Sequence, residues 1–205
     1  MAGIAFVEYA FGYTSDLKLV ELANLDHPLL KELILRAPGT YHHSIIMGSI
    51  VEVAAHEINA NPLHARVGAY YHDIGKMKKP MYFIENQHGG VNKHDELSPA
   101  MSILIISSHV KEGVELALKH KLGNIVKDSI EQHHGTTLMD YFYQKAKDTQ
   151  DESMDPVNES EYRYNCPKPK TKETALVMLA DGVEAATRSI ANPTASKIQQ
   201  MVEKV

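Results

Sequence analysis

Helix start and stop signals recur along this 205-residue chain and constrain its fold more than any other feature. Asn61-Pro62 and Ser98-Pro99 each place a capping side chain directly before a proline, an arrangement typical of helix N-termini. Pro38-Gly39 ends a short helix that begins at Leu29. Between these signals, apolar residues recur at three- and four-residue spacing, and alternating runs typical of strands are few. The sequence therefore predicts an all-α domain.

The expected helices occupy residues 29–37, 40–59, 62–75, 99–107, 110–120, 123–134, 136–147, 172–189 and 194–204. In the helix at 40–59, Ile46, Ile50, Val53 and Ala54 form one apolar stripe, a pattern typical of a helix that faces a core.

The length of the chain allows one large domain with arms. We expect residues 1–25 to be an N-terminal connector arm and residues 26–205 to form the domain. Residues 77–97 contain proline, paired glycines and polar side chains, and a connection of this length is more often functional than idle. Residues 148–170 are acidic and have few apolar anchors, which predicts a solvated loop.

The composition excludes several classes of protein. A net charge of -5 and a pI near 6.2 leave no global basic field for a nucleic-acid polymer or an anionic bilayer, although a local basic patch is not excluded. No stretch approaches the roughly 18 apolar residues of a membrane-spanning helix. The single cysteine, Cys166, cannot form an intramolecular disulfide, as is common in a reducing compartment.

Histidine is unusually frequent, with 12 residues, and the strongest local signal is His72-Asp73 near the end of the helix expected at 62–75. Neighbouring helical residues point about 100° apart, so both side chains can approach one metal centre. Imidazole nitrogen and carboxylate oxygen suit divalent transition metals, and a carboxylate can bridge two ions. Taken alone, such a pair is more often a cap or a salt bridge.

Other candidate ligands strengthen the metal interpretation. An unpaired imidazole in an apolar helix is costly to bury, and a carboxylate in an apolar run needs a compensating cation. Seven candidate ligands come from five expected helices: His43, His72, Asp73, His109, His133, His134 and Asp181. Each alone is compatible with a satisfied core or cap residue, but their order indicates a common metal site.

The order of His43, His72-Asp73 and Asp181 resembles that of the HD phosphohydrolase superfamily, and the additional histidines resemble its two-metal branch. Longer motifs resemble the cytoplasmic HD domain of the seven-transmembrane HD proteins, the PgpH family: HPLLK at 27–31, APGTYHHS at 37–44, GAYYHDIGKM at 68–77, FIENQ at 83–87 and HHGT at 133–136. The resemblance covers about residues 15–190. It implies a multi-helix HD-domain bundle with a two-metal site in its centre.

The resemblance also implies a function, the hydrolysis of cyclic di-AMP to linear 5'-pApA by a metal-bridging hydroxide. One divalent transition metal ion would bind His43, His72, Asp73 and Asp181, and the other would bind Asp73, His109, His133 and His134. Two ions about 3.5 to 4 Å apart can activate water for an in-line attack on phosphorus. Iron or manganese suits this ligand set, although zinc and cobalt are not excluded.

Two basic residues are candidates for phosphate contacts. Lys76 follows Asp73 by three residues, so its ammonium lies either near the metal face or on the surface. Arg188 lies two turns after Asp181 and either reaches a phosphate or pairs with Glu184. We assign catalytic roles to Asp73 and Lys76, and substrate-binding roles to Lys76 and Arg188.

Several alternatives stay open. The substrate is alternatively cyclic di-GMP or another nucleotide, although the Gly-Tyr-Pro element typical of the cyclic di-GMP branch is absent after His133-His134. A module that senses nucleotides without turnover is a further alternative. The family resemblance also implies a cytoplasmic domain of a bacterial membrane protein whose membrane helices lie outside this chain. The sequence does not decide between a monomer and a homodimer.

Overall fold

The computed structural model describes residues 14–87, 89, 92–150, 156–188, 190 and 192–204. Within this part of the chain there are helices and one isolated antiparallel bridge, Leu138 with Arg163, and no strand. The α-helices are α2 (Asp16–Leu22), α3 (Pro28–Arg36), α4 (Pro38–Glu57), α5 (Pro62–Tyr71), α6 (Pro99–Lys119), α7 (Asn124–Gln132), α8 (Asp140–Asp148), α9 (Lys172–Arg188) and α10 (Ala195–Val202). The predicted all-α class is confirmed.

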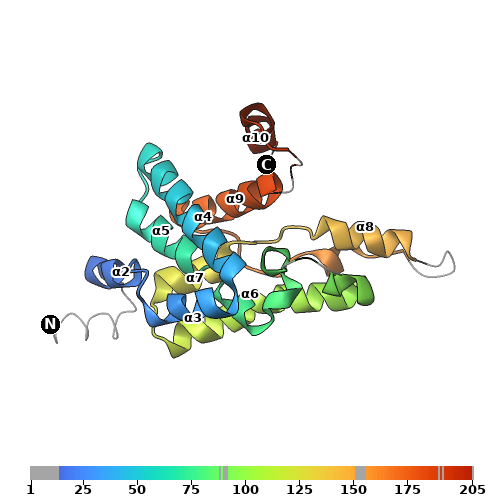
Figure 1. Cartoon of the computed structure of the whole chain (residues 1–205), viewed down its shortest axis with the longest axis horizontal. Helices are drawn as coiled ribbons and strands as arrows, with labels where there is room; N and C mark the ends of the chain where they lie inside the picture. The colour runs from blue at the N-terminus through green and yellow to red at the C-terminus, as the bar shows by residue number, and fades with distance from the viewer. Residues whose placement is uncertain are drawn as a thin grey trace.

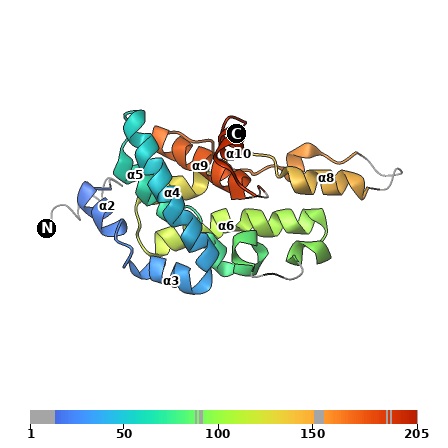
Figure 2. The same ribbon diagram turned by 45° about the horizontal axis from the view of Figure 1, so that its top comes forward.

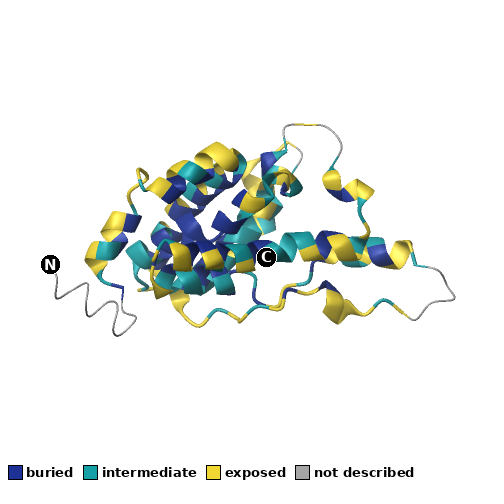
Figure 3. Ribbon diagram, turned by 90° about the horizontal axis from the view of Figure 1, so that it is seen from below, coloured by how far each residue is buried: buried dark blue, intermediate teal, exposed yellow. Residues whose placement is uncertain are grey.

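The helices form a body with an extension at one end. In the body, α4 packs against α5 and α9, and α7 packs against α5 and α6. The long helix α6 continues out of the body, and α8 lies beside its far part, so α2 and α8 occupy opposite ends of the molecule (Figures 1 and 2). Buried residues are concentrated where the helices of the body cross (Figure 3).

The capping signals in the sequence act as expected. The Asn61 side chain accepts hydrogen bonds from the backbone N–H groups of Leu63 and His64, and the Ser98 hydroxyl accepts from Met101. Each cap is followed by a proline, which has no N–H to satisfy. These caps therefore fix where α5 and α6 begin.

One helix replaces the two that were predicted at 99–107 and 110–120. The Ser107 and Ser108 hydroxyls donate to the carbonyls of Ile103 and Ile105, at 2.7 and 2.8 Å, so both serines are satisfied inside α6 and do not end it. The helix predicted at 136–147 begins later, at Asp140.

The apolar stripe of α4 does not face the core as predicted. Ile50 is 43% exposed and Val53 is 65% exposed, and the buried face of α4 instead carries His43, Met47 and Val51. The helix is therefore rotated so that a histidine points inward. Apolar residues on both faces of α4 allow either orientation, and the polar partners of His43 lie on the inner side.

The two segments expected to lie outside the packed domain both contribute to it. Leu19 and Leu22 of α2 are fully buried in the main core cluster, and the Tyr71 hydroxyl donates to the carbonyl of Leu22 at 2.9 Å. In the segment expected to be a solvated loop, Tyr162 and Tyr164 are buried. Leu19 and Leu22 thus tie the described part of the expected arm to the core, and Tyr162 and Tyr164 anchor a segment whose other described residues are exposed or half-buried, while residues 1–13 and 151–155 lie outside the described residues.

Backbone hydrogen bonds hold residues 162–166 against residues 135–139. Tyr162 accepts from the N–H of Met139 at 2.8 Å, and the N–H of Tyr164 donates to Thr137 at 3.0 Å. The N–H of Cys166 donates to Gly135 at 3.1 Å. Residues 162–166 therefore run antiparallel to residues 135–139, directly after His133-His134.

The burial of α2 can be tested by comparing two leucines of the same helix. Leu19→Ala leaves a cavity in the main core, so we expect it to lower the free energy of unfolding by about 2 to 5 kcal/mol. Leu17→Ala is the matched control, because Leu17 is 63% exposed, and we expect a change of about 0.5 kcal/mol or less. Urea unfolding followed by circular dichroism measures both. Equal effects of the two substitutions would contradict the packing of α2 in the core.

Candidate metal centre

Five helices, α4, α5, α6, α7 and α9, and the residues that directly follow α5 and α7 bring the seven candidate ligands together. Ligand atoms of His43, His72, Asp73 and Asp181 lie within 4.8 Å of one another, and the same holds for Asp73, His109, His133 and His134. Asp73 belongs to both groups and is 1% exposed. These two groups are the same two ligand sets that the family resemblance implies for the two metal ions.

Three of the histidines are oriented by backbone carbonyls of their own helices. Nδ1 of His72 lies 2.7 Å from the carbonyl oxygen of Ala69, and Nδ1 of His133 lies 2.8 Å from that of Ile130. Nδ1 of His109 makes the same contact three residues back, with Ile106. A carbonyl only accepts, so each Nδ1 carries the hydrogen and each Nε2 presents a lone pair. Such a contact is typical of metal-binding histidines.

The free nitrogens converge at distances that a shared ion explains. Nε2 of His43 lies 3.3 Å from Nε2 of His72 and 3.2 Å from Oδ1 of Asp181. Nε2 of His109 lies 3.3 Å from Nε2 of His133. Metal–nitrogen bonds of about 2.0 to 2.1 Å place neighbouring ligand atoms about 3.0 to 3.4 Å apart in octahedral or tetrahedral geometry.

The carboxylate of Asp73 is the group whose hydrogen-bonding capacity the surrounding protein satisfies least. Both carboxylate oxygens are buried, and among the described residues no donor meets either of them with hydrogen-bond geometry. The Lys76 ammonium lies 2.7 Å from Oδ2 as an ion pair. Burial raises the pKa of Asp73, but Lys76 and His72 outweigh it and hold the pKa well below its usual range. A buried, ionised carboxylate that pairs with an ammonium at Oδ2 and has no hydrogen bond at Oδ1 among the described residues fits a bridging ligand.

The two sides of the centre differ in the ionisation of their histidines. Burial lowers the pKa of His109 to about 4. The nearby Asp73 carboxylate partly offsets this shift, and His133 adds to it. Burial and His133 likewise lower the pKa of His134. Burial lowers the pKa of His43, but hydrogen bonds to Asp181 and Glu184 outweigh it and raise the pKa to about 9. His109 and His134 therefore present neutral imidazoles near neutral pH.

A very close backbone contact places Asp73 between the two histidine groups. A Cβ atom on Gly75 would lie 1.9 Å from the carbonyl oxygen of His109 and 2.6 Å from the backbone nitrogen of Gly113. Only glycine fits there, so the short helix η1 (Ile74–Lys78) lies directly against α6. This contact brings Asp73 within 3.3 Å of Nε2 of His109.

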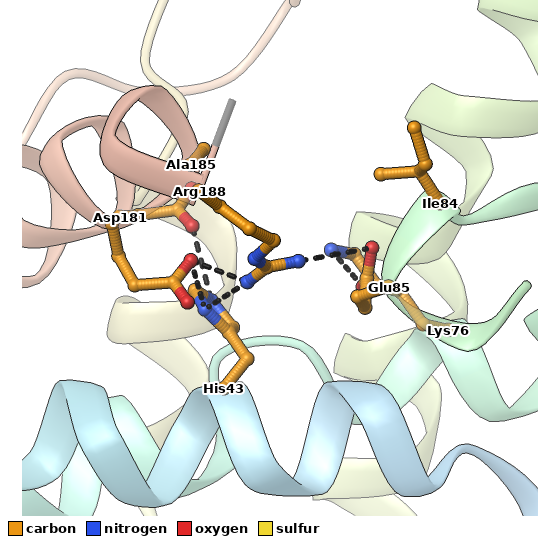
Figure 4. A pocket seen from close by; sticks show the side chains of 8 residues that line it. His43, Lys76, Ile84, Glu85, Asp181, Ala185 and Arg188 are labelled. Carbon is orange, nitrogen blue, oxygen red and sulfur yellow. Dashed lines mark hydrogen bonds and ion pairs between the residues drawn. The ribbon is translucent and has the colours of Figure 1, made fainter. Parts of the chain in front are cut away.

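A pocket of about 220 Å³ adjoins the His43 side of the centre, and Lys76 and Arg188 both line it. The Arg188 side chain extends from α9 across the pocket toward Glu85 and Lys76 (Figure 4). The Lys76 side chain is only 14% exposed, which excludes the alternative of a surface lysine, and its ammonium lies 2.9 Å from Oε1 of Glu85. Arg188 pairs with Glu184, as one of the two alternatives predicted, while facing the pocket.

Sequence reasoning missed two residues of the centre. Glu85 lies on η3 (Ile84–Asn86), where its Oε1 accepts from the Thr40 hydroxyl at 3.0 Å and pairs with Lys76. The Tyr164 ring stacks on His134, with ring centroids 4.0 Å apart and planes inclined by 16°. Their segments, 77–97 and 148–170, showed no helical periodicity, so the only available signal was the expected functional role of the first.

The family comparison agrees with this geometry. The family model described as HD domain matches residues 40–186, which include all seven candidate ligands. The chain belongs to the HD domain family. The predicted resemblance is thereby confirmed, and both ligand groups lie inside the matched range.

Within this HD domain family, the chain is similar to two curated bacterial proteins named Cyclic-di-AMP phosphodiesterase PgpH. It is 48% identical over 202 residues to the protein of Listeria monocytogenes and 47% identical over 200 residues to that of Bacillus subtilis. Both matches cover 98% of this chain. The chain spans 28% of the length of these relatives.

A solved structure extends the comparison to three dimensions. The HD domain of the L. monocytogenes phosphodiesterase PgpH in complex with cyclic-di-AMP is 48% identical and superposes with a TM-score of 0.82. The match covers 88% of this chain and 83% of that one. The HD-domain fold is therefore confirmed.

The metal centre predicts that Asp73 matters more than any one histidine. Asp73→Ala removes a ligand shared by both groups, so we expect it to reduce bound metal at both positions, whereas His43→Ala affects one. His42→Ala is the matched control, because the neighbouring His42 is exposed and outside both groups. Elemental analysis of protein purified from iron- and manganese-supplemented cells measures the content. Metal-free wild-type protein from both cultures would contradict the centre.

Proposed function

We propose that this chain is a metal-dependent phosphodiesterase that hydrolyses cyclic di-AMP to linear 5'-pApA. The observation that carries the proposal is the convergence of seven ligand side chains on two adjoining groups that share Asp73. The relatives named for cyclic di-AMP hydrolysis, and the similar domain solved with cyclic di-AMP, support the choice of substrate.

Two divalent ions, iron or manganese, supply an activated water and stabilise charge on the phosphate when they are bound. His43, His72, Asp73 and Asp181 would hold one ion, and Asp73, His109, His133 and His134 would hold the other. Imidazole-rich coordination with a bridging carboxylate suits these metals, and zinc and cobalt remain alternatives that metal analysis separates.

The charges of the protein itself explain why substrate binding requires the metals. Among the described residues, the centre and its pocket contain four carboxylates, Asp73, Glu85, Asp181 and Glu184, against the basic groups of Lys76, Arg188 and His43, whose pKa is raised to about 9. Such a site repels a phosphodiester. Bound divalent cations reverse the sign of the local field.

Lys76 and Arg188 orient the phosphodiester beside the centre. The Lys76 ammonium is held between Asp73 and Glu85, so it is fixed in direction before substrate arrives. The Arg188 guanidinium is 38% exposed and can present two parallel N–H groups to phosphate oxygens. The pocket is smaller than the roughly 300 to 1,000 Å³ of typical ligand sites, so it receives one phosphodiester and part of a nucleoside.

We further propose that the chain is the cytoplasmic HD domain of a longer, membrane-anchored bacterial protein. The support is its coverage of 28% of the PgpH relatives, together with the motifs that resemble the seven-transmembrane HD proteins. In the part of the chain that the structure describes, the helices are too short or too polar to span a bilayer.

Substrate choice is tested by comparing turnover of cyclic di-AMP, cyclic di-GMP and linear pApA by manganese- or iron-loaded protein. We expect kcat/KM for cyclic di-AMP to exceed that for cyclic di-GMP by at least ~10-fold, with 5'-pApA as product. Chromatography of the products measures both. Cyclic di-GMP cleavage of equal efficiency would overturn the substrate and leave the reaction intact. Fully metallated protein that cleaves no phosphodiester would overturn both and favour a sensing module.

A further inference from the structure

His43 is held differently from the other anchored histidines of the metal centre. Its Nδ1 lies 2.9 Å from Oε2 of Glu184, a side-chain carboxylate on α9, one turn after the ligand Asp181. Backbone carbonyls hold the corresponding nitrogens of His72, His109 and His133. A backbone carbonyl only accepts a hydrogen bond, whereas side chains around His43 include a competing donor.

That donor is Arg188. Its Nη2 lies 3.1 Å from Nδ1 of His43, and the same nitrogen forms an ion pair with Glu184. Guanidinium groups donate and never accept. A hydrogen bond from Arg188 to Nδ1 would therefore leave the hydrogen of a neutral imidazole on Nε2, the atom that faces Asp181 and His72.

We propose that Glu184 is a positioning residue that keeps the hydrogen of His43 on Nδ1, against the competing donor Arg188, and so leaves Nε2 free as a metal ligand. The inference rests on the proposed metal centre and adds a residue outside both ligand groups. Glu184 acts twice, because it accepts from Nδ1 and also engages the guanidinium that would otherwise donate there. Carboxylates in this position commonly tune metal-bound histidines.

A double-mutant cycle separates this role from simple packing. We expect Glu184→Ala to weaken binding of one of two Mn²⁺ ions by roughly 10- to 100-fold, the range typical of such outer partners. Arg188→Ala alone leaves Glu184 in place, so both ions bind as in wild type. The double variant Glu184→Ala/Arg188→Ala regains most of the lost affinity, because the competing donor is gone. Glu184→Gln loses less than Glu184→Ala, since its amide oxygen still accepts.

The measurement is titration of the metal-free full chain with Mn²⁺, following the electron paramagnetic resonance signal of the free ion. Leu179→Ala is the control on α9, because Leu179 is exposed and lies outside both ligand groups, and it binds both ions as wild type does. Circular dichroism checks that each variant folds. Unchanged binding in Glu184→Ala, or a double variant as weak as Glu184→Ala, overturns the proposal.

Nitrogen NMR of the Zn²⁺-loaded wild-type chain tests the tautomer without any variant. We expect a hydrogen on Nδ1 of His43 and none on Nε2, and the opposite tautomer overturns the proposal. Wild-type protein that binds neither Mn²⁺ nor Zn²⁺ would contradict the metal centre and this inference together. Protein that binds two ions and shows the expected cycle, but does not cleave cyclic di-AMP, would contradict only the proposed function.

Discussion

The structure depends above all on keeping one ionised carboxylate, that of Asp73, in the interior. Burial of an uncompensated charge is costly, and the surrounding helices are arranged to compensate it. The Lys76 ammonium lies 2.7 Å from one oxygen, and Nε2 of His109 lies 3.3 Å from the other. Because Lys76 pairs with Oδ2 while Oδ1 faces Nε2 of His109 without a hydrogen bond among the described residues, the surroundings of Asp73 suit cations and not a neutral core.

The packing of the surrounding helices brings the side chains of the centre close to that carboxylate. The contact of Gly75 with the backbone of α6 sets the distance between Asp73 and His109. The rotation of α4 exposes Ile50 and Val53 and turns His43 inward, where Asp181 and Glu184 lie within 3.2 and 2.9 Å. The exposure of these apolar side chains thus accompanies the pairing of His43 with Asp181 and Glu184. Leaving such buried polar groups unpaired would cost more free energy than exposing apolar side chains.

Segments without regular periodicity complete the centre. The short helices after α5 place Glu85 beside Lys76. The antiparallel contact of residues 162–166 with residues 135–139 places the Tyr164 ring against His134. Both additions depend on side chains or backbone groups far apart in sequence. Irregular segments that carry functional residues on a rigid helical scaffold are common in enzymes.

The sequence by itself determined the helical class, the positions of the capped helix starts and the set of seven metal-ligand candidates, because caps, prolines and ligand types are local properties. It did not determine which face of α4 is buried, since apolar residues occur on both faces and the packing of α5 and α9 against α4 decides between them. It also left the roles of Lys76 and Arg188 open, because a basic side chain of that length reaches several partners. Tertiary packing decided the buried face of α4 and the contacts of these two side chains, because it encloses Lys76 between Asp73 and Glu85 and places Glu184 within reach of Arg188.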